Sequence, residues 1–149
     1  VARHLLSLCR RRKIRLLIGA DPELAARIGA DGVHWPERMA GQSRKWRGRF
    51  KLQTVSGHRG YNRVLLRTLS VDAVLFSTVF ASNSASSGHP MGAMKFRRLV
   101  PSLPKPAYAL GGVNPYNGLC IADSAGMAAI EGWMCFEVRQ MDADRKRAV

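Results

Sequence analysis

Residues 14–35 read IRLLIGADPELAARIGADGVHW and contain one strand–helix–strand repeat. The β-branched and leucine-rich run at 14–18 is typical of a strand that is buried on both faces. Asp21 followed by Pro22 predicts the start of a helix, because the acid caps free backbone N–H groups and proline is preformed for the first helical position. A glycine ends this helix, and the short apolar stretch at 32–35 predicts the next strand.

The same alternation continues along the chain. Further strands are predicted at 50–55, 73–76, 107–110 and 127–130. Helices are predicted at 4–12, 22–28, 37–47, 59–69, 93–100 and 117–122, and Val64, Leu65 and Leu69 are expected on the buried side of the fourth. Strict alternation predicts an α/β fold with a parallel sheet and right-handed crossovers. An open doubly wound sheet and a (β/α)8 barrel both fit this pattern. No glycine-rich dinucleotide or P-loop motif follows a strand, which argues against those nucleotide sites.

Composition places the chain among ordinary folded proteins. Its 149 residues are 46% hydrophobic and 23% charged, which suits one domain with a real core. No apolar run reaches the roughly 18 residues of a membrane span. The N-terminus is apolar and then basic, the reverse of a signal peptide, so a cytoplasmic protein with no membrane partner is expected. Cys9, Cys120 and Cys135 lack zinc-ligand spacing and are interpreted as reduced thiols.

The net charge of +14 is concentrated in two clusters. One is formed by residues 10–13 with Arg15. The second, here called the basic cluster, consists of Arg44, Lys45, Arg47, Arg49 and Lys51, with Trp46 and Phe50 interleaved. Three explanations stay open: arginine-rich outer helices in solvent, a phosphorylated small-molecule ligand, and nucleic acid.

Gly111 and Gly112 directly follow the apolar segment 106–110. Glycines at the end of a strand expose backbone N–H groups with no side chain in the way, and such groups bind phosphate. The pair therefore predicts either a phosphate-binding loop or simply a tight turn.

Five segments, in order, resemble the thiamine-phosphate synthase and thiazole tautomerase superfamily. They are residues 24–35, the Ser-x-His at 55–58, residues 74–82, Ala-Leu-Gly-Gly-Val-Asn at 109–114, and residues 125–130. The resemblance implies a TIM (β/α)8-barrel type of fold with about six βα units present and the first two missing. It places a partial barrel at 1–138 and a charged tail at 139–149. Three explanations for the missing units stay open: a misplaced gene start, a fragment, and a sheet that is closed by a partner.

The resemblance also implies a site with two phosphate-binding parts. Pyrophosphate would be contacted by Ser56, Ser82 and Ser84, and the thiazole phosphate would be held by Gly111, Gly112 and Gly132. Trp35 and His58 would line the pocket. His34 is interpreted as a packed strand histidine. No catalytic residue is assigned.

The family uses Mg²⁺, which carboxylates must hold. The family's Asn-Asp pair is replaced here by Gly19-Ala20, so Asp21 and Glu37 are the only weak candidates for metal ligands. Each also has an ordinary explanation, as a helix cap and as an acid in a first helical turn. Mg²⁺ is therefore expected only if the chain is active.

The sequence thus predicts a thiamine-phosphate-synthase-like protein of thiamine biosynthesis. Such a protein couples a hydroxymethylpyrimidine diphosphate to a thiazole phosphate and releases pyrophosphate. The alternatives are an inactive or divergent homologue that binds small phosphates, and a basic module associated with nucleic acid. Phosphorylated small molecules are the expected partners, a homo-oligomer is possible, and nucleic acid is not expected.

Overall fold

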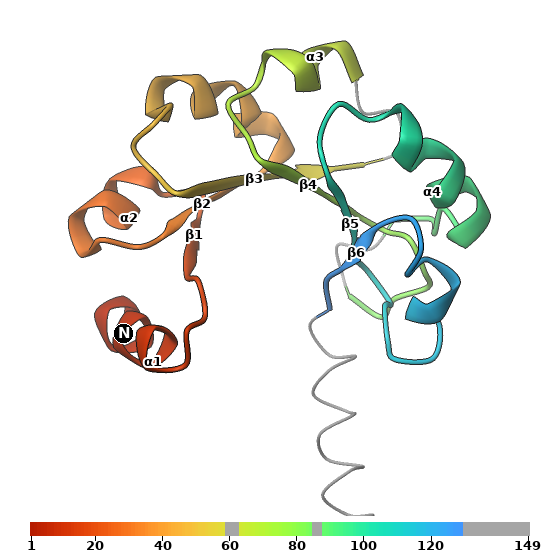
Figure 1. Ribbon diagram of the computed structural model, residues 1–149, viewed down its shortest axis with the longest axis horizontal. Coiled ribbons are helices and arrows are strands. Elements are labelled where there is room, and N and C mark those ends of the chain that lie inside the picture. Colours follow the sequence, from red (N-terminus) through yellow and green to blue (C-terminus); the bar gives the residue numbers. More distant parts are fainter. Residues whose placement is uncertain (59–62, 85–87, 130–149) are drawn as a thin grey trace, which may run out of the picture. The chain divides into compact units, whose positions relative to one another are not determined.

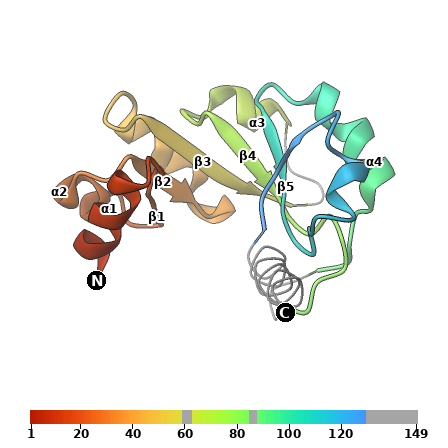
Figure 2. The same cartoon turned by 60° about the horizontal axis from the view of Figure 1, so that its bottom comes forward.

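The computed structural model describes residues 1–58, 63–84 and 88–129. Its six strands form one sheet in which they are neighbours in chain order, from β1 to β6 (Figures 1 and 2). The chain divides into two compact units. Unit 1 is Val1–Val74 with Pro104–Pro106, and unit 2 is Leu75–Leu103 with Ala107–Val149.

Unit 1 holds the first three strands and the helices between them. In order these are α1 (Ala2–Arg11), β1 (Leu17–Gly19), α2 (Pro22–Ile28), β2 (Gly32–Trp35), the 3₁₀ helix η1 (Glu37–Trp46), β3 (Leu52–Gly57) and α3 (Arg63–Thr68). Strand β4 (Ala73–Phe76) is divided between the units. Unit 2 continues with α4 (Ala93–Leu99), η2 (Val100–Ser102), β5 (Ala107–Ala109), η3 (Gly118–Cys120) and β6 (Gly126–Met127).

The predicted start of α2 is confirmed. The Asp21 carboxylate accepts a hydrogen bond from the Leu24 backbone N–H at 2.8 Å, and Pro22 occupies the first helical turn. At the other end Gly29 adopts a left-handed conformation with φ 71°, which suits glycine and ends the helix. The pairing of β1 with β2 and of β2 with β3 is parallel, so the carboxyl ends of these strands meet at one edge of the sheet.

Successive side chains of β2 and β3 point to opposite faces of the sheet, one that packs against helices and one that does not. Val33, Trp35 and Val55 have no exposed surface, and both α2 and η1 pack against the strands that carry them. The ribbon shows α2 and η1 along this side of the strands in unit 1 (Figure 1). His34 is only half-buried, because neighbouring residues of a strand point to opposite faces. This second face carries the polar groups described below.

Three helix predictions need correction. Residues 37–46 form a 3₁₀ helix, and only Gly118–Cys120 of the helix predicted at 117–122 is helical, again as a 3₁₀ helix. In α3 the predicted buried side was partly wrong: Val64 is 70% exposed, whereas Leu66 is fully buried with Leu69. Residues 59–62, at the start of the helix predicted for 59–69, lie outside the described residues.

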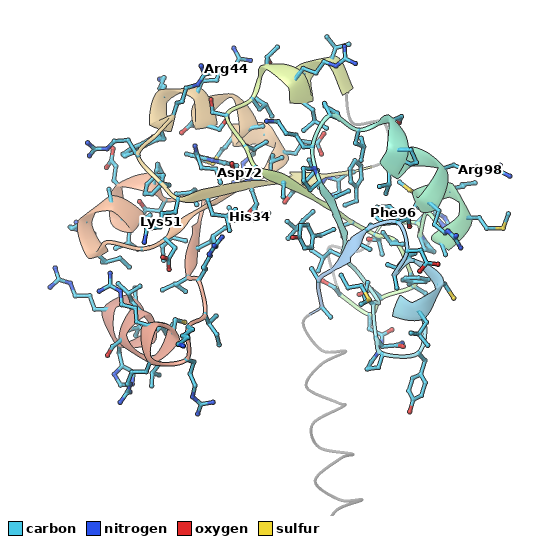
Figure 3. The ribbon with its side chains drawn as sticks, in the orientation of Figure 1. His34, Arg44, Lys51, Asp72, Phe96 and Arg98 are labelled. Carbon is cyan, nitrogen blue, oxygen red and sulfur yellow. The ribbon has the colours of Figure 1, made fainter. Side chains whose placement is uncertain are left out.

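Aromatic packing organises the core of unit 2. The rings of Phe76 in β4 and Phe96 in α4 lie with their centroids 6.1 Å apart. Phe96 is on the side of α4 toward the strands and Arg98 is on the opposite side (Figure 3). Residue 130 of the last predicted strand and the predicted tail at 139–149 lie outside the described residues. In the part of the chain that is described, no helix has the length and apolarity needed to cross a membrane.

Candidate functional site

A histidine and two hydroxyl groups form a polar row on β2 and β3 in unit 1. The register places His34 opposite Thr54. The Nδ1 atom of His34 lies 2.9 Å from the Thr54 hydroxyl oxygen, and its Nε2 atom lies 2.9 Å from the Ser56 hydroxyl oxygen. His34 is labelled in Figure 3 on the face of β2 away from η1. His34, which the sequence predicts to be a packed strand histidine, therefore lies within hydrogen-bonding distance of Ser56, one of the predicted ligand contacts.

Burial lowers the pKa of His34 below its ordinary value of 6.5. The cause is desolvation, which disfavours the charged imidazolium. The ring is therefore neutral at neutral pH, with one nitrogen that donates a hydrogen bond and one that accepts.

This shift predicts how stability changes in acid. A lowered pKa means that the unfolded chain takes up the His34 proton at a higher pH than the folded chain, so the free energy of unfolding falls as the pH drops below about 6.5. His34→Gln should lose less stability than the wild type between pH 7.5 and pH 5.0, because glutamine does not titrate. Urea unfolding of both proteins at the two pH values measures this. Equal losses in the two proteins would contradict it.

Glu37 and His58 form a hydrogen bond at the same edge of the sheet. Glu37 begins η1 just after Pro36, which follows β2, and His58 directly follows β3. The Glu37 Oε2 atom lies 2.5 Å from His58 Nδ1, and both side chains are partly exposed. The pair fixes the His58 ring next to the end of the strand that carries Ser56. Two predicted site residues are thus near each other along β3, and a predicted metal candidate is paired with one of them.

The described residues do not fit the Mg²⁺ that the resemblance implies. Asp21 caps α2 and Glu37 is paired with His58, so each weak candidate already has a partner. The carboxylates of Asp31 and Asp72 accept backbone N–H groups of Leu16 and Gln53. Among the residues that the structure describes, no three acidic, histidine or cysteine side chains gather as metal ligands would.

Trp35 is a core residue, and the prediction that it lines the pocket is wrong. Its side chain has no exposed surface and its indole N–H donates to the Gln53 side-chain oxygen at 2.9 Å. Trp35 follows His34 directly in β2, so it points to the opposite, helix-covered face. Strand alternation alone indicates this, since His34 and Trp35 cannot both face the same site.

The basic cluster is anchored by neutral partners of unit 1. The Arg44 guanidinium donates to the Thr68 hydroxyl at 3.0 Å, and the Arg47 Nε donates to the Ser70 hydroxyl at 2.9 Å. Trp46 and Phe50 stack on each other with centroids 5.5 Å apart. Arg44 lies on the outer side of η1 in Figure 3. The two aromatic rings that would stack with nucleic-acid bases are thus engaged with each other.

In unit 2, the glycine pair forms a tight loop after β5. Gly111 and Gly112 both have positive φ, at 87° and 62°, a region that other residues enter only at a cost. Their carbonyl groups are bound: the Gly111 oxygen accepts from the Phe80 N–H at 3.0 Å, and the Gly112 oxygen accepts from the Asn117 side chain at 2.8 Å. These contacts tie the loop to Phe80 and Asn117.

The amide groups of the same two glycines have no such partners in the part of the chain that the structure describes. Within residues 1–58, 63–84 and 88–129, neither the Gly111 N–H nor the Gly112 N–H donates a hydrogen bond. Both residues are only partly buried. Two backbone donors therefore remain for a ligand at the carboxyl end of β5, where loops of parallel α/β folds bind phosphate.

The remaining predicted contacts belong to unit 2. A side chain at Gly112 would meet the carbonyl of Ala81, so the neighbouring Ser82 lies close to the glycine loop. The Ser82 hydroxyl accepts the Ser84 N–H at 3.3 Å. Gly132 lies outside the described residues.

A chain-ordered parallel sheet with polar side chains at the carboxyl ends of its strands defines the α/β class of fold, in which ligands commonly bind at that edge of the sheet. A family model for thiamine monophosphate synthase matches residues 1–133. The chain therefore belongs to the thiamine monophosphate synthase family.

Relatives agree with this assignment. The thiamine-phosphate synthase of Xylella fastidiosa is 31% identical, over 88% of this chain and 58% of that protein. The thiamine-phosphate synthase of Lysinibacillus sphaericus is 30% identical, over 87% of this chain and 63% of that protein. The structure of thiamine phosphate pyrophosphorylase from Pyrococcus furiosus shares the fold, with a TM-score of 0.70 at 19% identity, over 86% of this chain and 62% of that one. The chain thus spans about three fifths of these relatives.

Proposed function

We propose that this chain binds the phosphate of a thiazole phosphate at the Gly111–Gly112 loop. The observation that carries the proposal is the pair of glycine amides without acceptors, in a loop whose carbonyl groups are already bound. Phosphate oxygens accept hydrogen bonds from such donors, and they gain from amides that are already in place. Ser82 is near this loop, and we propose that it and Ser84 contact the ligand, with Gly132 as a further backbone contact.

We further propose a second anion subsite in unit 1, formed by Ser56 and His58. It would bind the diphosphate of the hydroxymethylpyrimidine substrate, so that the chain serves the coupling reaction of thiamine-phosphate synthases. Glu37 accepts a hydrogen bond from His58 Nδ1, which orients the His58 ring beside Ser56. We assign no catalytic residue.

The barrel-type closure of the sheet, a cytoplasmic location and a homo-oligomer stay predictions. A divergent homologue that only binds phosphate esters has the same glycine loop, and turnover of the two substrates separates it from an active synthase.

Calorimetric titration with thiazole phosphate tests the proposal. We expect saturable binding of the phosphate ester and at least tenfold weaker binding of the matched thiazole alcohol, because the alcohol lacks the group that the amides recognise. Equal affinities for the two compounds would contradict the assignment. Repeating the titration with chelator and with Mg²⁺ tests whether binding needs the metal.

Salt dependence separates this proposal from binding of nucleic acid by the basic cluster. A polyanion that makes six to ten phosphate contacts loses about 10³–10⁵ in affinity between 50 and 200 mM salt. One phosphate held mainly by neutral amides should lose less than about fivefold over the same range. A thiazole-phosphate affinity that falls a hundredfold would instead indicate a cationic surface as the binding site.

A further inference from the structure

We propose that His34 is a positioning residue that fixes the Ser56 hydroxyl as a hydrogen-bond donor toward a bound phosphate or diphosphate. The inference concerns unit 1 alone, and its ligand part rests on the anion subsite proposed for Ser56 and His58. The contacts that carry it are the two 2.9 Å approaches of the His34 ring to Thr54 and Ser56.

A neutral imidazole bridging two hydroxyl groups allows two proton arrangements. In the first, His34 Nε2–H donates to the Ser56 oxygen and the Thr54 hydroxyl donates to Nδ1. In the second, Nδ1–H donates to the Thr54 oxygen and the Ser56 hydroxyl donates to Nε2. In the first arrangement the Ser56 O–H is free to donate to a ligand. In the second arrangement Ser56 has only lone pairs to present to it.

The burial of Thr54 selects the first arrangement. The Thr54 side chain is 7% exposed, and within the described residues its hydroxyl has one hydrogen-bond partner, the Nδ1 atom of His34. In the second arrangement the Thr54 proton would be buried without an acceptor, which proteins rarely tolerate. In the first arrangement that proton is satisfied, and the unpaired proton belongs to Ser56, which is only half-buried.

The consequence for binding follows from the chemistry of phosphate. At neutral pH a diphosphate is anionic and its oxygens act mainly as acceptors, so a free Ser56 O–H attracts it and bare lone pairs repel it. Thr54 therefore acts on the ligand through His34, and His34 acts through Ser56. Neither Thr54 nor His34 needs to touch the ligand.

The first test is made on the free chain and needs no ligand. Two-bond ¹H–¹⁵N correlation spectra at pH 7.5 identify which ring nitrogen of His34 carries the proton. We expect the Nε2–H form in the wild type, and a shift toward a mixture of both forms in Thr54→Val, which removes the donor to Nδ1. Thr68→Val removes a hydroxyl on α3 and should leave the His34 signals unchanged. An Nδ1–H form in the wild type would overturn the proposal.

The second test uses inorganic pyrophosphate as the probe in calorimetric titrations. Ser56→Ala should weaken binding about tenfold, and both Thr54→Val and His34→Leu should weaken it at least threefold. His34→Gln should restore most of the affinity, because its amide can donate to the Ser56 oxygen. Thr68→Val should bind like the wild type.

Two results of the second test would overturn the proposal. In one, Thr54→Val and His34→Leu bind pyrophosphate as tightly as the wild type while Ser56→Ala does not. In the other, the wild type does not bind pyrophosphate. Thiazole-phosphate binding, measured separately, then shows whether the function proposed for the glycine loop fails as well.

Discussion

Gly112→Ala is expected to abolish thiazole-phosphate binding and to lower the free energy of unfolding of unit 2 by about 3 kcal/mol or more. A Cβ atom at Gly112 would lie 2.0 Å from the backbone oxygen of Ala81 and 2.8 Å from that of Phe80. Neither backbone carbonyl can turn away as a flexible side chain would. The left-handed φ of 62° adds about 1 kcal/mol for any residue with a Cβ.

Gly92→Ala is the matched control within unit 2. Gly92 also has a positive φ, of 82°, but a Cβ there meets nothing within 4 Å. This variant should lose about 1–3 kcal/mol of stability, because a φ of 82° with a ψ of 150° suits only glycine, and it should bind thiazole phosphate normally. Urea unfolding and titration of both variants separate the backbone cost from the steric cost. A Gly112→Ala protein that is as stable as Gly92→Ala and still binds thiazole phosphate would contradict the close packing of Gly112 against the Ala81 carbonyl.

Gly32→Ala is expected to destabilise unit 1 by about 3 kcal/mol or more. A Cβ at Gly32 would lie 1.7 Å from the backbone oxygen of Leu52, its partner in the β2–β3 register. The strands would have to move apart, and His34 would lose its alignment with Thr54 and Ser56. Pyrophosphate binding should therefore weaken together with stability.

Gly19→Ala provides the comparison on the neighbouring strand. A Cβ at Gly19, the last residue of β1, meets nothing within 4 Å. The free energy of unfolding of Gly19→Ala should stay within about 0.5 kcal/mol of the wild-type value. The two variants are compared by thermal and urea unfolding. A Gly32→Ala protein as stable as Gly19→Ala would contradict the close packing of β2 against β3.

Local sequence signals predicted much of the fold. Asp21 and Pro22 predicted the start of α2, because capping depends on neighbouring residues. The buried side of α3 was partly misplaced, since a helix of six described residues has several adjacent leucine and valine side chains that satisfy a helical period. Which of Val64 and Leu66 is buried depends on how α3 packs against the rest of unit 1, and helical periodicity alone does not decide it.

The candidate site was less predictable, because it depends on contacts between strands. The pairing of Glu37 with His58 and the position of His34 between two hydroxyls follow from the β2–β3 register, which joins residues about 20 positions apart. Gly111 and Gly112 were visible in sequence, but their bound carbonyls and free amides were not. Trp35 was misassigned although alternation with His34 indicated its face.

Amide NMR spectra of the ¹⁵N-labelled chain, titrated with thiazole phosphate, test the central proposal most directly. Phosphate bound at the glycine loop should shift the Gly111 and Gly112 amide signals downfield, in proportion to occupancy and with one dissociation constant. The thiazole alcohol should leave both signals in place. Saturation of the protein with thiazole phosphate while these two signals stay unchanged and those of residues 44–51 move would contradict the account.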